Sequence, residues 1–585
     1  MGPRLPTRAW IALAGVALAL VPLAKPPAFY ESFLYLVFHW VVLATSWNIL
    51  SGYSGYFSFG HGAFFGAGMY TTATLAGQFG VPFLWTLPVA ALVAALFGMG
   101  IGAVVFRVGR LRGELFALLT LAVTFVLATV VLNTPIDGGQ GVNLGGVKLP
   151  AILPTPSATF YILALALAVL TLYIAYEIRR SRLGLGLFAI HDDEDVAEVM
   201  GVPTFRYKIV AFGVSCALAG VAGGIHAMFV SYVTVGETFS IIVPLTVVLM
   251  SVLGGTRHWL GPAAGAAVIT VLLYLFTAGD YAIAGRAAVG LILIVVILFL
   301  PGGMLGRYAG RAAGRPVARG VAPPTGVEPV RGGVAPAAPP APAGEPLLAV
   351  RGLSKSFKGL KALDGVDLDV RRGEILGLVG PNGSGKSTLI NLVSGHYRCD
   401  GGRVRFGGRD LAGAEAHRIA RAGIARTYQI PRPFQHLTVL QNVALTARFG
   451  RDALDRESAE REALHWLEFT GLAAKANDLP ADLNLHQRKF LELARALASR
   501  PELLLLDEVL SGLTPSEIDD AIRTIRAIRD RGATIVFVEH VMRAVMELTD
   551  RIVVLNHGRV IAEGLPAEVM GRAEVVTAYL GKPRA

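Results

Sequence analysis

Long apolar stretches separated by short polar connections fill the first 300 residues of the chain. About ten such stretches can be recognised, and most are long enough to cross the hydrocarbon core of a bilayer as helices. The pattern therefore predicts an all-α polytopic transmembrane domain of about ten helices. The predicted spans are residues 10–23, 29–50, 57–76, 82–106, 115–132, 158–178, 209–232, 239–253, 262–276 and 284–300.

The first predicted span, 10–23, has a second interpretation. Arg4 and Arg8 precede a run of about thirteen apolar residues, and positive charge before a short apolar run is also typical of a secretory signal peptide. The sequence leaves open whether this segment is retained as a transmembrane helix. Its removal would not change the orientation of the other spans.

Basic residues of the connecting segments gather on one of the two sides that ten crossings define. Cytoplasmic loops are enriched in Lys and Arg, so this side is predicted to be the cytoplasm. The segment 133–154 then lies outside, and the chain after residue 347 lies in the cytoplasm. The basic residues on the cytoplasmic side are Arg4, Arg8, Arg107, Arg110, Arg112, Arg179, Arg180, Arg182, Arg206, Lys208, Arg257, Arg307 and Arg311.

Composition supports a membrane protein joined to a soluble part. Mean hydropathy is +0.55 and 16% of the residues are charged, which is too apolar for a soluble protein of 585 residues. The net charge of +11 is compatible with nucleic-acid binding, but arginines at span ends and in a linker account for it, so we expect no nucleic-acid partner. Cys216 and Cys399 lie in different regions, and we expect no structural disulfide between them.

A segment with no large apolar residue after Tyr308 separates the apolar region from the rest. It consists mostly of Gly, Ala, Pro, Val and Arg, so it cannot form a core, and we expect a disordered tether. A Pro-rich partner-binding motif is the alternative. The predicted domains are the transmembrane region 1–303, the linker 304–346 and an α/β domain over 347–585.

A glycine-rich run organises the α/β domain. It follows a strand-like apolar segment, 374–379, and fits G-x-x-x-x-G-K-[ST], the P-loop, in which backbone N–H groups surround phosphate oxygens at a helix N-terminus. Lys386 is predicted to reach the β- and γ-phosphates of ATP, and Ser387 to ligate Mg²⁺. The predicted ATP-binding residues are Gly380, Pro381, Asn382, Gly383, Ser384, Gly385, Lys386, Ser387 and Thr388.

Two further strand-like segments end in residues that suit ATP hydrolysis. The run 503–506 is followed by Asp507, predicted to hold Mg²⁺, and Glu508, predicted to polarise the attacking water. The run 534–539 is followed by His540, at the sheet edge where ligands of open α/β sheets bind.

Together these motifs resemble the nucleotide-binding domain of ABC transporters over residues 347–583. The runs 425–429 and 578–581 are similar to the G-type ATPase of branched-chain amino acid (Liv-type) importers. The resemblance implies that His540 contacts the γ-phosphate and that Gln429 senses Mg²⁺ and water. The implied catalytic residues are Glu508, His540 and Gln429, and the implied magnesium-site residues are Ser387, Gln429 and Asp507. Phe357 is a candidate to stack on adenine, and as an isolated aromatic residue it could equally belong to the core.

The ABC signature departs from the family pattern L-S-G-G-Q. Asn484 replaces the serine, Leu485 and His486 replace the glycines, and Gln487 remains. The side chains of Leu485 and His486 lie where the backbone of the signature is expected to approach the nucleotide of the partner domain closely. Because the signature completes the ATP site of the partner domain, the hypothesis is an asymmetric dimer with one consensus site. Val509 replaces the proline usual after the catalytic glutamate, and nothing in the sequence explains this change.

Several runs of the apolar region resemble the M-type permease of the same importers, over residues 30–305. The resemblance implies an importer fold. The runs that carry it are 48–55, 60–65, 111–118, 250–255 and the segment from Asp192 onward.

Two stretches of the permease region stand out. The run 52–66 is rich in glycine at membrane depth and indicates either close helix packing or a broken helix that lines a substrate path. Its candidate path residues are Gly52, Gly55, Gly60 and His61.

The polar segment 192–203 lies between two spans on the predicted cytoplasmic side. Ile190, Val196, Val199 and Met200 can form one apolar helical face. From the residues, a solvated acidic loop and a coupling helix that docks on an ATPase are both open, and a metal site of Asp192, Asp193 and Asp195 has no EF-hand spacing. The resemblance implies the coupling loop, with Asp192, Asp193, Glu194 and Gly201 as its candidate residues.

The resemblance as a whole implies an ATP-driven importer of branched-chain amino acids or related small polar, amide or organic-acid substrates in the bacterial inner membrane. Its cofactors would be ATP and Mg²⁺. Its partners would be a periplasmic substrate-binding protein and either a second permease (LivH-like) and a second ATPase (LivF-like) or a second copy of the chain. The competing class is a membrane ABC ATPase that acts in export or signalling.

Overall fold

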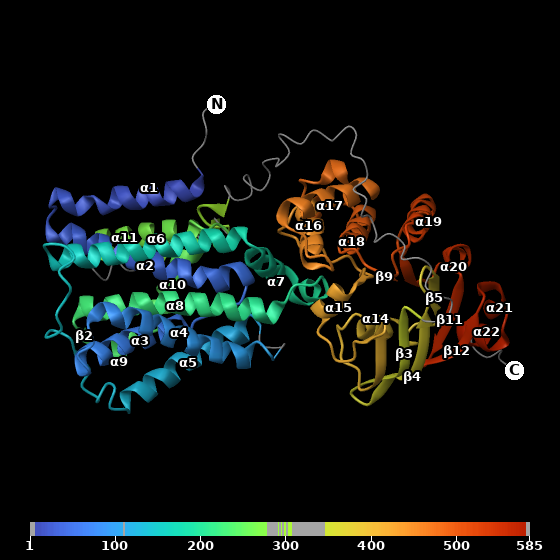
Figure 1. The fold of residues 1–585 in the computed structure, drawn as a ribbon, viewed down its shortest axis with the longest axis horizontal. Coiled ribbons are helices and arrows are strands. Elements are labelled where there is room, and N and C mark those ends of the chain that lie inside the picture. The colour runs from blue at the N-terminus through green and yellow to red at the C-terminus, as the bar shows by residue number, and fades with distance from the viewer. Residues whose placement is uncertain are drawn as a thin grey trace. The chain divides into compact units, whose positions relative to one another are not determined.

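The computed structural model describes residues 6–108, 112–277, 346–580 and a few positions between 290 and 306. These residues form two compact units, which Figure 1 colours along the chain. The helical unit contains Met1–His191 and Thr204–Ala313, and the α/β unit contains Gly314–Ala585 together with the short segment Asp192–Pro203. The segment 192–203 therefore groups with the distant C-terminal region and not with the helices that flank it.

The helical unit consists of long helices that run side by side (Figure 1). Among the described residues, seven helical stretches are long and apolar enough to cross a membrane: Thr7–Ala24, Ala28–Ser54, Phe83–Val105, Glu114–Leu132, Pro156–Arg180, Thr204–Val230 and Val235–Gly254. The elements are α1 (Thr7–Ala19), α2 (Ala28–Ser54), α3 (His61–Thr72), α4 (Phe83–Val105), α5 (Glu114–Leu132), α6 (Pro156–Arg180), α7 (Arg182–Val199), α8 (Thr204–Val230), α9 (Val235–Thr238), α10 (Ile242–Gly254), α11 (Gly261–Thr277), and the short strands β1 (Val142–Asn143) and β2 (Tyr232–Val233).

Most predicted spans coincide with these helices within a few residues, and the differences have local causes. The predicted span 57–76 starts too early, because α2 continues to Ser54 and ends at Gly55, whose left-handed φ of +74° turns the chain. The helix α3 begins only at His61. Most of the predicted span 284–300 and nearly all of the predicted linker fall outside the described residues.

Helix α8 forms the centre of the helical unit and packs against α2, α3 and α4. Small residues allow this close approach, because helices in lipid associate mainly through backbone proximity and packing. A Cβ atom on Gly68 of α3 would lie 2.0 Å from the carbonyl oxygen of Gly220 in α8, so a larger residue there would force the helices apart.

Helix α1 packs against α6. Arg8 and Glu177 form a two-point ion pair of 2.6 and 2.7 Å, and the Tyr161 hydroxyl donates to the carbonyl oxygen of Leu18 at 2.7 Å. The first apolar stretch thus forms a helix that contacts α6, with Ile11 as its one buried residue. Whether this segment is retained stays a prediction.

The α/β unit contains two sheets. The first has the strand order β12-β11-β5-β10-β9-β8, with parallel neighbours except for the β11–β12 pair, and the second is antiparallel with the order β4-β3-β6-β7. The strands are β3 (Leu348–Phe357), β4 (Leu360–Val370), β5 (Ile375–Val379), β6 (Gly401–Phe406), β7 (Arg409–Asp410), β8 (Ile424–Arg426), β9 (Leu503–Asp507), β10 (Thr534–Val538), β11 (Arg551–Asn556) and β12 (Arg559–Gly564).

Helices cover these sheets and bury two apolar cores, each of which includes side chains from the central strands β5, β9 and β10. Those three strands are buried along their whole length, as expected of parallel strands covered on both faces. The helices are α14 (Lys386–Val393), α15 (Ala416–Ala422), α16 (Val439–Phe449), α17 (Arg456–Phe469), α18 (Leu485–Ala498), α19 (Pro515–Asp530), α20 (Met542–Leu548), α21 (Pro566–Met570) and α22 (Ala573–Leu580).

Candidate functional site

Four neighbouring parallel strands, β5, β10, β9 and β8, bring distant motifs to one edge of the sheet. The carboxyl ends of parallel strands meet at the same edge. The P-loop follows β5, His540 follows β10, Asp507 ends β9, and Gln429 follows β8. The fold thus collects the predicted nucleotide-site residues on one side of the sheet.

The P-loop wraps between β5 and α14. Gly380 and Gly385 have φ values of +150° and +108°, and a Cβ atom on Gly380 would lie 2.1 Å from the carbonyl oxygen of Leu555. Lys386 Nζ donates to the carbonyl oxygens of Gly380 and Pro381 at 2.7 and 3.0 Å. Burial lowers the pKa of Lys386, and the nearby carboxylates of Glu508 and Asp507 oppose this shift. The ammonium group is thus held inside the loop, where a phosphate would meet it.

Glu508 lies between the two other predicted catalytic residues. Gln429 Nε2 donates to its Oε2 at 2.6 Å, and His540 Nε2 lies 3.1 Å from its Oε1. These residues come from three different strand ends. The structure therefore brings together the three residues that the family resemblance grouped as catalytic.

The backbone of Glu508 is itself unusual. Its φ of +48° lies in the left-handed region that non-glycine residues rarely adopt. Two contacts hold it there: the Glu508 N–H donates to Val538 O at 2.9 Å, and Lys489 Nζ donates to Glu508 O at 3.2 Å. Lys489 was not predicted, and no sequence signal marks it beyond its place on α18 after the signature.

Asp507 is buried at the end of β9, and its environment fits a cation ligand. Its Oδ1 has no hydrogen-bond partner among the described residues, and its Oδ2 lies 3.7 Å from Nη2 of the buried Arg426. Burial raises the pKa of this carboxyl, and Arg426 partly offsets the shift. An unpartnered buried carboxylate oxygen beside the P-loop suits Mg²⁺, together with the exposed Ser387.

Glu539 is a second buried carboxyl at this edge, and sequence reasoning passed over it as the end of a strand. It is 1% exposed and accepts hydrogen bonds from the N–H groups of Leu510 and His540 at 2.6 and 3.2 Å. Burial raises its pKa to about 7, against the opposing effect of these two N–H groups. Through these two hydrogen bonds, the Glu539 carboxylate connects the loop after Glu508 to the backbone of His540.

The altered signature forms the start of α18. Asn484 caps this helix: its Oδ1 accepts from the Gln487 N–H at 2.8 Å, and Gln487 Oε1 accepts from the Asn484 N–H at 3.1 Å. This reciprocal pair is a capping box. Leu485 is 49% exposed, and the His486 ring lies against Phe490 with centroids 4.4 Å apart. Asn484 thus fulfils the capping role that a serine would have.

Phe357 lies at the surface, 39% exposed, and makes an edge contact with Tyr397 at 5.3 Å between ring centroids. The alternative that it belongs to the core is wrong. Its position at the end of β3 leaves the ring accessible to a planar ligand.

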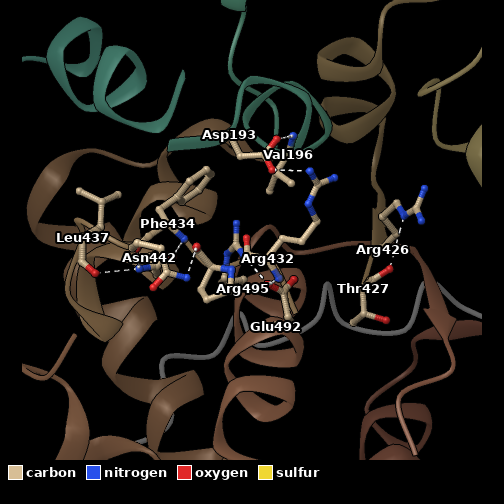
Figure 2. A network of polar contacts seen from close by, with 12 residues as sticks. Asp193, Val196, Arg426, Thr427, Arg432, Phe434, Leu437, Asn442, Glu492 and Arg495 are labelled. Atoms are coloured by element: carbon tan, nitrogen blue, oxygen red, sulfur yellow. Dashed lines mark hydrogen bonds and ion pairs between the residues drawn. The ribbon is translucent and has the colours of Figure 1, made fainter. Parts of the chain in front are cut away.

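The segment Asp192–Pro203 docks on the α/β unit through charges (Figure 2). Helix α7 is interrupted at Asp193, which has extended backbone angles. One Asp193 oxygen accepts from the Val196 N–H at 3.1 Å, and the other is 2.7 Å from Arg432 Nη2. Asp193 therefore starts a new helical turn and binds the loop after Gln429 at the same time.

Asp192 makes a second contact with that loop, because its carboxylate accepts from the His436 N–H at 3.0 Å and also pairs with the His436 ring. Gly201 is required by close packing, since a Cβ atom there would lie 2.3 Å from Phe449 O. Glu194 is buried. A metal site of the aspartates is not formed: no cluster of metal-ligating side chains occurs within the described residues.

The loop 432–438 is held by several hydrogen bonds to the helices beneath it, which Figure 2 draws. Asn442 accepts from the Phe434 N–H at 2.8 Å and donates to Phe434 O and Leu437 O at 3.0 Å each. Arg495 donates to Arg432 O at 3.0 Å and pairs with Glu492, all in the interior of the unit. Sequence reasoning missed these residues, because their importance lies in contacts between distant segments.

The glycine-rich run 52–66 is closely packed. A Cβ atom on Gly52 would lie 3.0 Å from Thr256 O, and one on Gly60 would lie 3.0 Å from the Thr120 side chain. His61 is buried, and its Nε2 is 2.9 Å from Ser46 Oγ. The role of these residues and of Gly55 in a substrate path stays a prediction.

Comparisons with known proteins identify both regions. Residues 29–300 match the model of the branched-chain amino acid transport system permease component, and residues 363–511 match the ABC transporter model. The ATP-binding protein BraF of Pseudomonas aeruginosa, named for high-affinity branched-chain amino acid transport, is 38% identical over 253 residues, which are 40% of this chain and 98% of BraF. This chain belongs to the branched-chain amino acid ABC transporter family.

A second relative of this branched-chain amino acid ABC transporter, LivG of Salmonella typhimurium, is 38% identical over 258 residues, 41% of this chain and 99% of LivG. The crystal structure of a nucleotide-free ATP-binding cassette from an ABC transporter is 30% identical and covers 41% of this chain and all of that one, with a TM-score of 0.37.

The family resemblance, the fold class and the ATPase assignment are thereby confirmed. The chain is an ATP-hydrolysing transporter subunit in which a membrane permease region is fused to a cytoplasmic ATP-binding domain, and its family implies further permease and ATPase subunits.

Proposed function

We propose that this transporter imports branched-chain amino acids, or related small polar, amide or organic-acid substrates, across the bacterial inner membrane. A periplasmic binding protein would deliver the substrate. The permease match and the names of the ATPase relatives support this substrate class. The proposed domains are the permease 1–303, the linker 304–346 and the ATPase 347–585.

The observation that carries the catalytic proposal is the placement of Glu508 between Gln429 and His540 beside the P-loop. Glu508 would accept a proton from the water that attacks the γ-phosphate, His540 would bind that phosphate, and Gln429 would orient the water and the base. Lys386 would leave the loop carbonyls that it now contacts and bind the β- and γ-phosphates. Phe357 would support the adenine ring.

Mg²⁺ would be held by Ser387, Asp507 and Gln429. When bound, it would neutralise negative charge on the phosphates. Asp507 is already oriented for this role by the Arg426 guanidinium and by the hydrogen bond from its own N–H to Thr427 Oγ1 at 3.2 Å.

ATP-driven movement would reach the permease through the segment Asp192–Pro203. Arg432 lies three residues after Gln429, so a movement of Gln429 at the ATP site would displace the partner of Asp193. The segment continues directly into α8, which is the central helix of the helical unit. The chain thus contains a covalent path from the docked segment to the permease core.

The transporter would contain two ATPase domains, with each signature completing the opposite ATP site. If the second ATPase is a different subunit with a consensus signature, the site formed by this chain's own P-loop would be the active one. If the partner is a second copy, both sites would contain Asn484, Leu485 and His486.

The test is ATP hydrolysis by the purified chain in lipid, wild type against Glu508→Gln, with and without partner permease and ATPase subunits. Hydrolysis by the chain alone that Glu508→Gln abolishes would indicate a working homodimer. Hydrolysis only after addition of partners would indicate a heteromer. Hydrolysis unaffected by Glu508→Gln would contradict the proposed base.

Transport direction is tested in the same reconstituted system. Import requires substrate to accumulate on the ATP-containing side of the vesicle membrane, because the ATPase domain faces that side. Substrate movement away from that side would favour export, and ATP hydrolysis without any transport would favour signalling.

A further inference from the structure

A cavity of about 120 Å³ lies within the helical unit, between α2, α3, α8 and the connection from β2 to α10. A single water molecule needs about 10–15 Å³ on this scale, so the cavity can hold a small organic molecule. None of the residues proposed above for a substrate path lines it. Its lining includes His39, Trp40, Phe65, Met69, His226 and Glu237.

The cavity lies toward the C-terminal end of α8. Helix α8 begins at Thr204, directly after the segment that belongs to the α/β unit, and it ends at Val230, which lines the cavity. Twenty-seven helical residues span about 40 Å. With the ATPase in the cytoplasm, the cavity is therefore on the outer half of the membrane, where an importer receives its substrate.

Polar side chains at the cavity have unused hydrogen-bonding capacity. His39 is 5% exposed and makes ring contacts, yet it has no hydrogen bond with any residue that the structure describes. The side chains of Trp40 and Thr238 likewise make no hydrogen bond within the described ranges. No atom of these three side chains is among the fully buried unpartnered atoms of the described residues, so their polar groups stay accessible, and as lining residues of the cavity they can bind a ligand there.

The second histidine of the cavity is held in place. The Tyr35 hydroxyl is 3.0 Å from His226 Nδ1, and the His226 ring stacks on His39 with centroids 4.5 Å apart. Tyr35 is fully buried and stacks on Phe229 at 4.1 Å. This aromatic column sets the orientation of His39 at the cavity wall.

The lining has two chemical sides. Phe65, Met69 and Val243 supply an apolar surface. The polar groups are N–H and O–H donors on His39, Trp40 and Thr238, and the carboxylate of Glu237 on α9. A convergent set of donors suits a carboxylate, and an anionic side chain suits an ammonium group.

We propose that this cavity is the substrate-binding site of the permease and that it selects α-amino acids with an apolar side chain. The substrate carboxylate binds at His39 and Trp40, its ammonium group binds at Glu237, and its side chain packs on Phe65, Met69 and Val243. The proposal rests on the import function above and narrows its substrate class: an organic acid would leave Glu237 without a cation, and an amide would leave the donors without an anion.

The first test is direct binding of L-leucine to the purified full-length chain in lipid nanodiscs, followed by tryptophan fluorescence. The sequence contains six tryptophans, so matched variants are needed to assign the signal. Trp40→Phe should remove most of the leucine-dependent change. Trp85→Phe should retain it, because Trp85 is 73% exposed on α4 and does not line the cavity. A change that survives Trp40→Phe would overturn the site.

The second test separates the two polar ends of the ligand. His39→Ala should weaken leucine binding at least tenfold, whereas His258→Ala, a histidine outside the cavity, should not change it. Glu237→Gln should weaken leucine binding and reduce at least tenfold its preference over 4-methylpentanoate, which lacks the amino group. Equal discrimination by wild type and Glu237→Gln would overturn the assigned orientation.

Uptake by the complex with its partner subunits distinguishes failure of the site from failure of the proposed function. If leucine is transported and the His39, Trp40 and Glu237 variants transport it within twofold of wild type, the cavity is not the substrate site. If another substrate is transported and leucine is neither bound nor transported, the amino-acid class is wrong. Loss of leucine uptake in these variants, with uptake retained by the control variants Trp85→Phe and His258→Ala, supports the proposal.

Discussion

Gln429 donates a hydrogen bond of 2.6 Å to the carboxylate of Glu508, although the two residues are 79 positions apart in the chain. The other carboxylate oxygen faces His540 at 3.1 Å. The proposed base is therefore held from both sides, by Gln429, which lies three residues before the Asp193 partner Arg432, and by His540 on a separate strand end. Any movement of the loop after Gln429 changes the surroundings of Glu508.

Gln429→Glu should shift the acidic limb of the pH–rate profile of ATP hydrolysis upward. A second carboxylate at the place of the amide would repel Glu508 and raise the pKa of the pair. The measurement is initial hydrolysis rate against pH in lipid. Gln435→Glu is the matched control on the same loop, since the Gln435 side chain donates to Pro433 O and makes no hydrogen bond to Glu508. An unchanged limb in Gln429→Glu would contradict a role for Glu508 as the base.

Asp193→Asn should separate hydrolysis from transport. Asparagine keeps an oxygen for the Val196 N–H but loses the ion pair with Arg432, so the helical turn persists while the docking contact weakens. We expect substrate moved per ATP to fall several-fold at nearly constant ATP affinity.

Arg432→Gln combined with Asp193→Asn should give little further loss, because both changes remove the same contact. Asp452→Asn breaks a different ion pair, with Arg500, and serves as a control. Fully additive losses in the double variant would show that the pair does not act as a unit.

Asn484→Ala should lower the unfolding free energy of the ATPase domain by about 1 kcal/mol, the usual effect of losing a helix N-cap. For a domain of this size the melting temperature would fall by roughly 2–4 °C. Asn484→Ser should keep the cap and therefore the stability. Thermal unfolding with both variants checks this, and equal melting temperatures would show that the capping box contributes nothing.

Glu539→Gln should flatten the pH dependence of stability between about pH 4.5 and 7. The pKa of Glu539 is raised to about 7 in the fold from the ordinary glutamate value of 4.5, so its stabilising effect is fully present below the lower value and is lost as pH rises through the upper one. The shift corresponds to about 3 kcal/mol. Unfolding free energy measured against pH for wild type and variant should diverge over this interval, and parallel curves would be contrary to the expectation.

The first apolar helix should be present in the mature protein. Arg8 and Glu177 pair at 2.6 Å, and Tyr161 binds the carbonyl oxygen of Leu18, contacts that a cleaved leader would not need. Intact-mass measurement of membrane-purified protein should therefore show a chain that still contains Arg8. A mass corresponding to loss of about the first 24 residues would establish the signal-peptide interpretation instead.

Sequence reasoning succeeded where the signal is local. Apolar stretches of sufficient length predicted the spans, and the P-loop glycines predicted the turn in which Gly380 and Gly385 take positive φ values. It was less accurate at helix ends, where a residue such as Gly55 ends α2 four residues later than the hydropathy suggested. It gave no indication of Lys489, Arg495 or Asn442, because ordinary residues in helices become important only through partners that are distant in the chain.

The sequence by itself determined the order of the parts: apolar spans, a linker and an α/β domain with its phosphate-binding loop, since hydropathy and motif spacing are properties of short segments. Only the tertiary structure decided which residues meet. Parallel pairing of β5, β10, β9 and β8 brought Gln429, Glu508 and His540 to one edge, and folding of the segment 192–203 with the C-terminal unit paired Asp193 with Arg432. Packing of α2, α3 and α8 likewise created the cavity around His39. Such contacts arise from the simultaneous burial of distant segments, which no local pattern specifies.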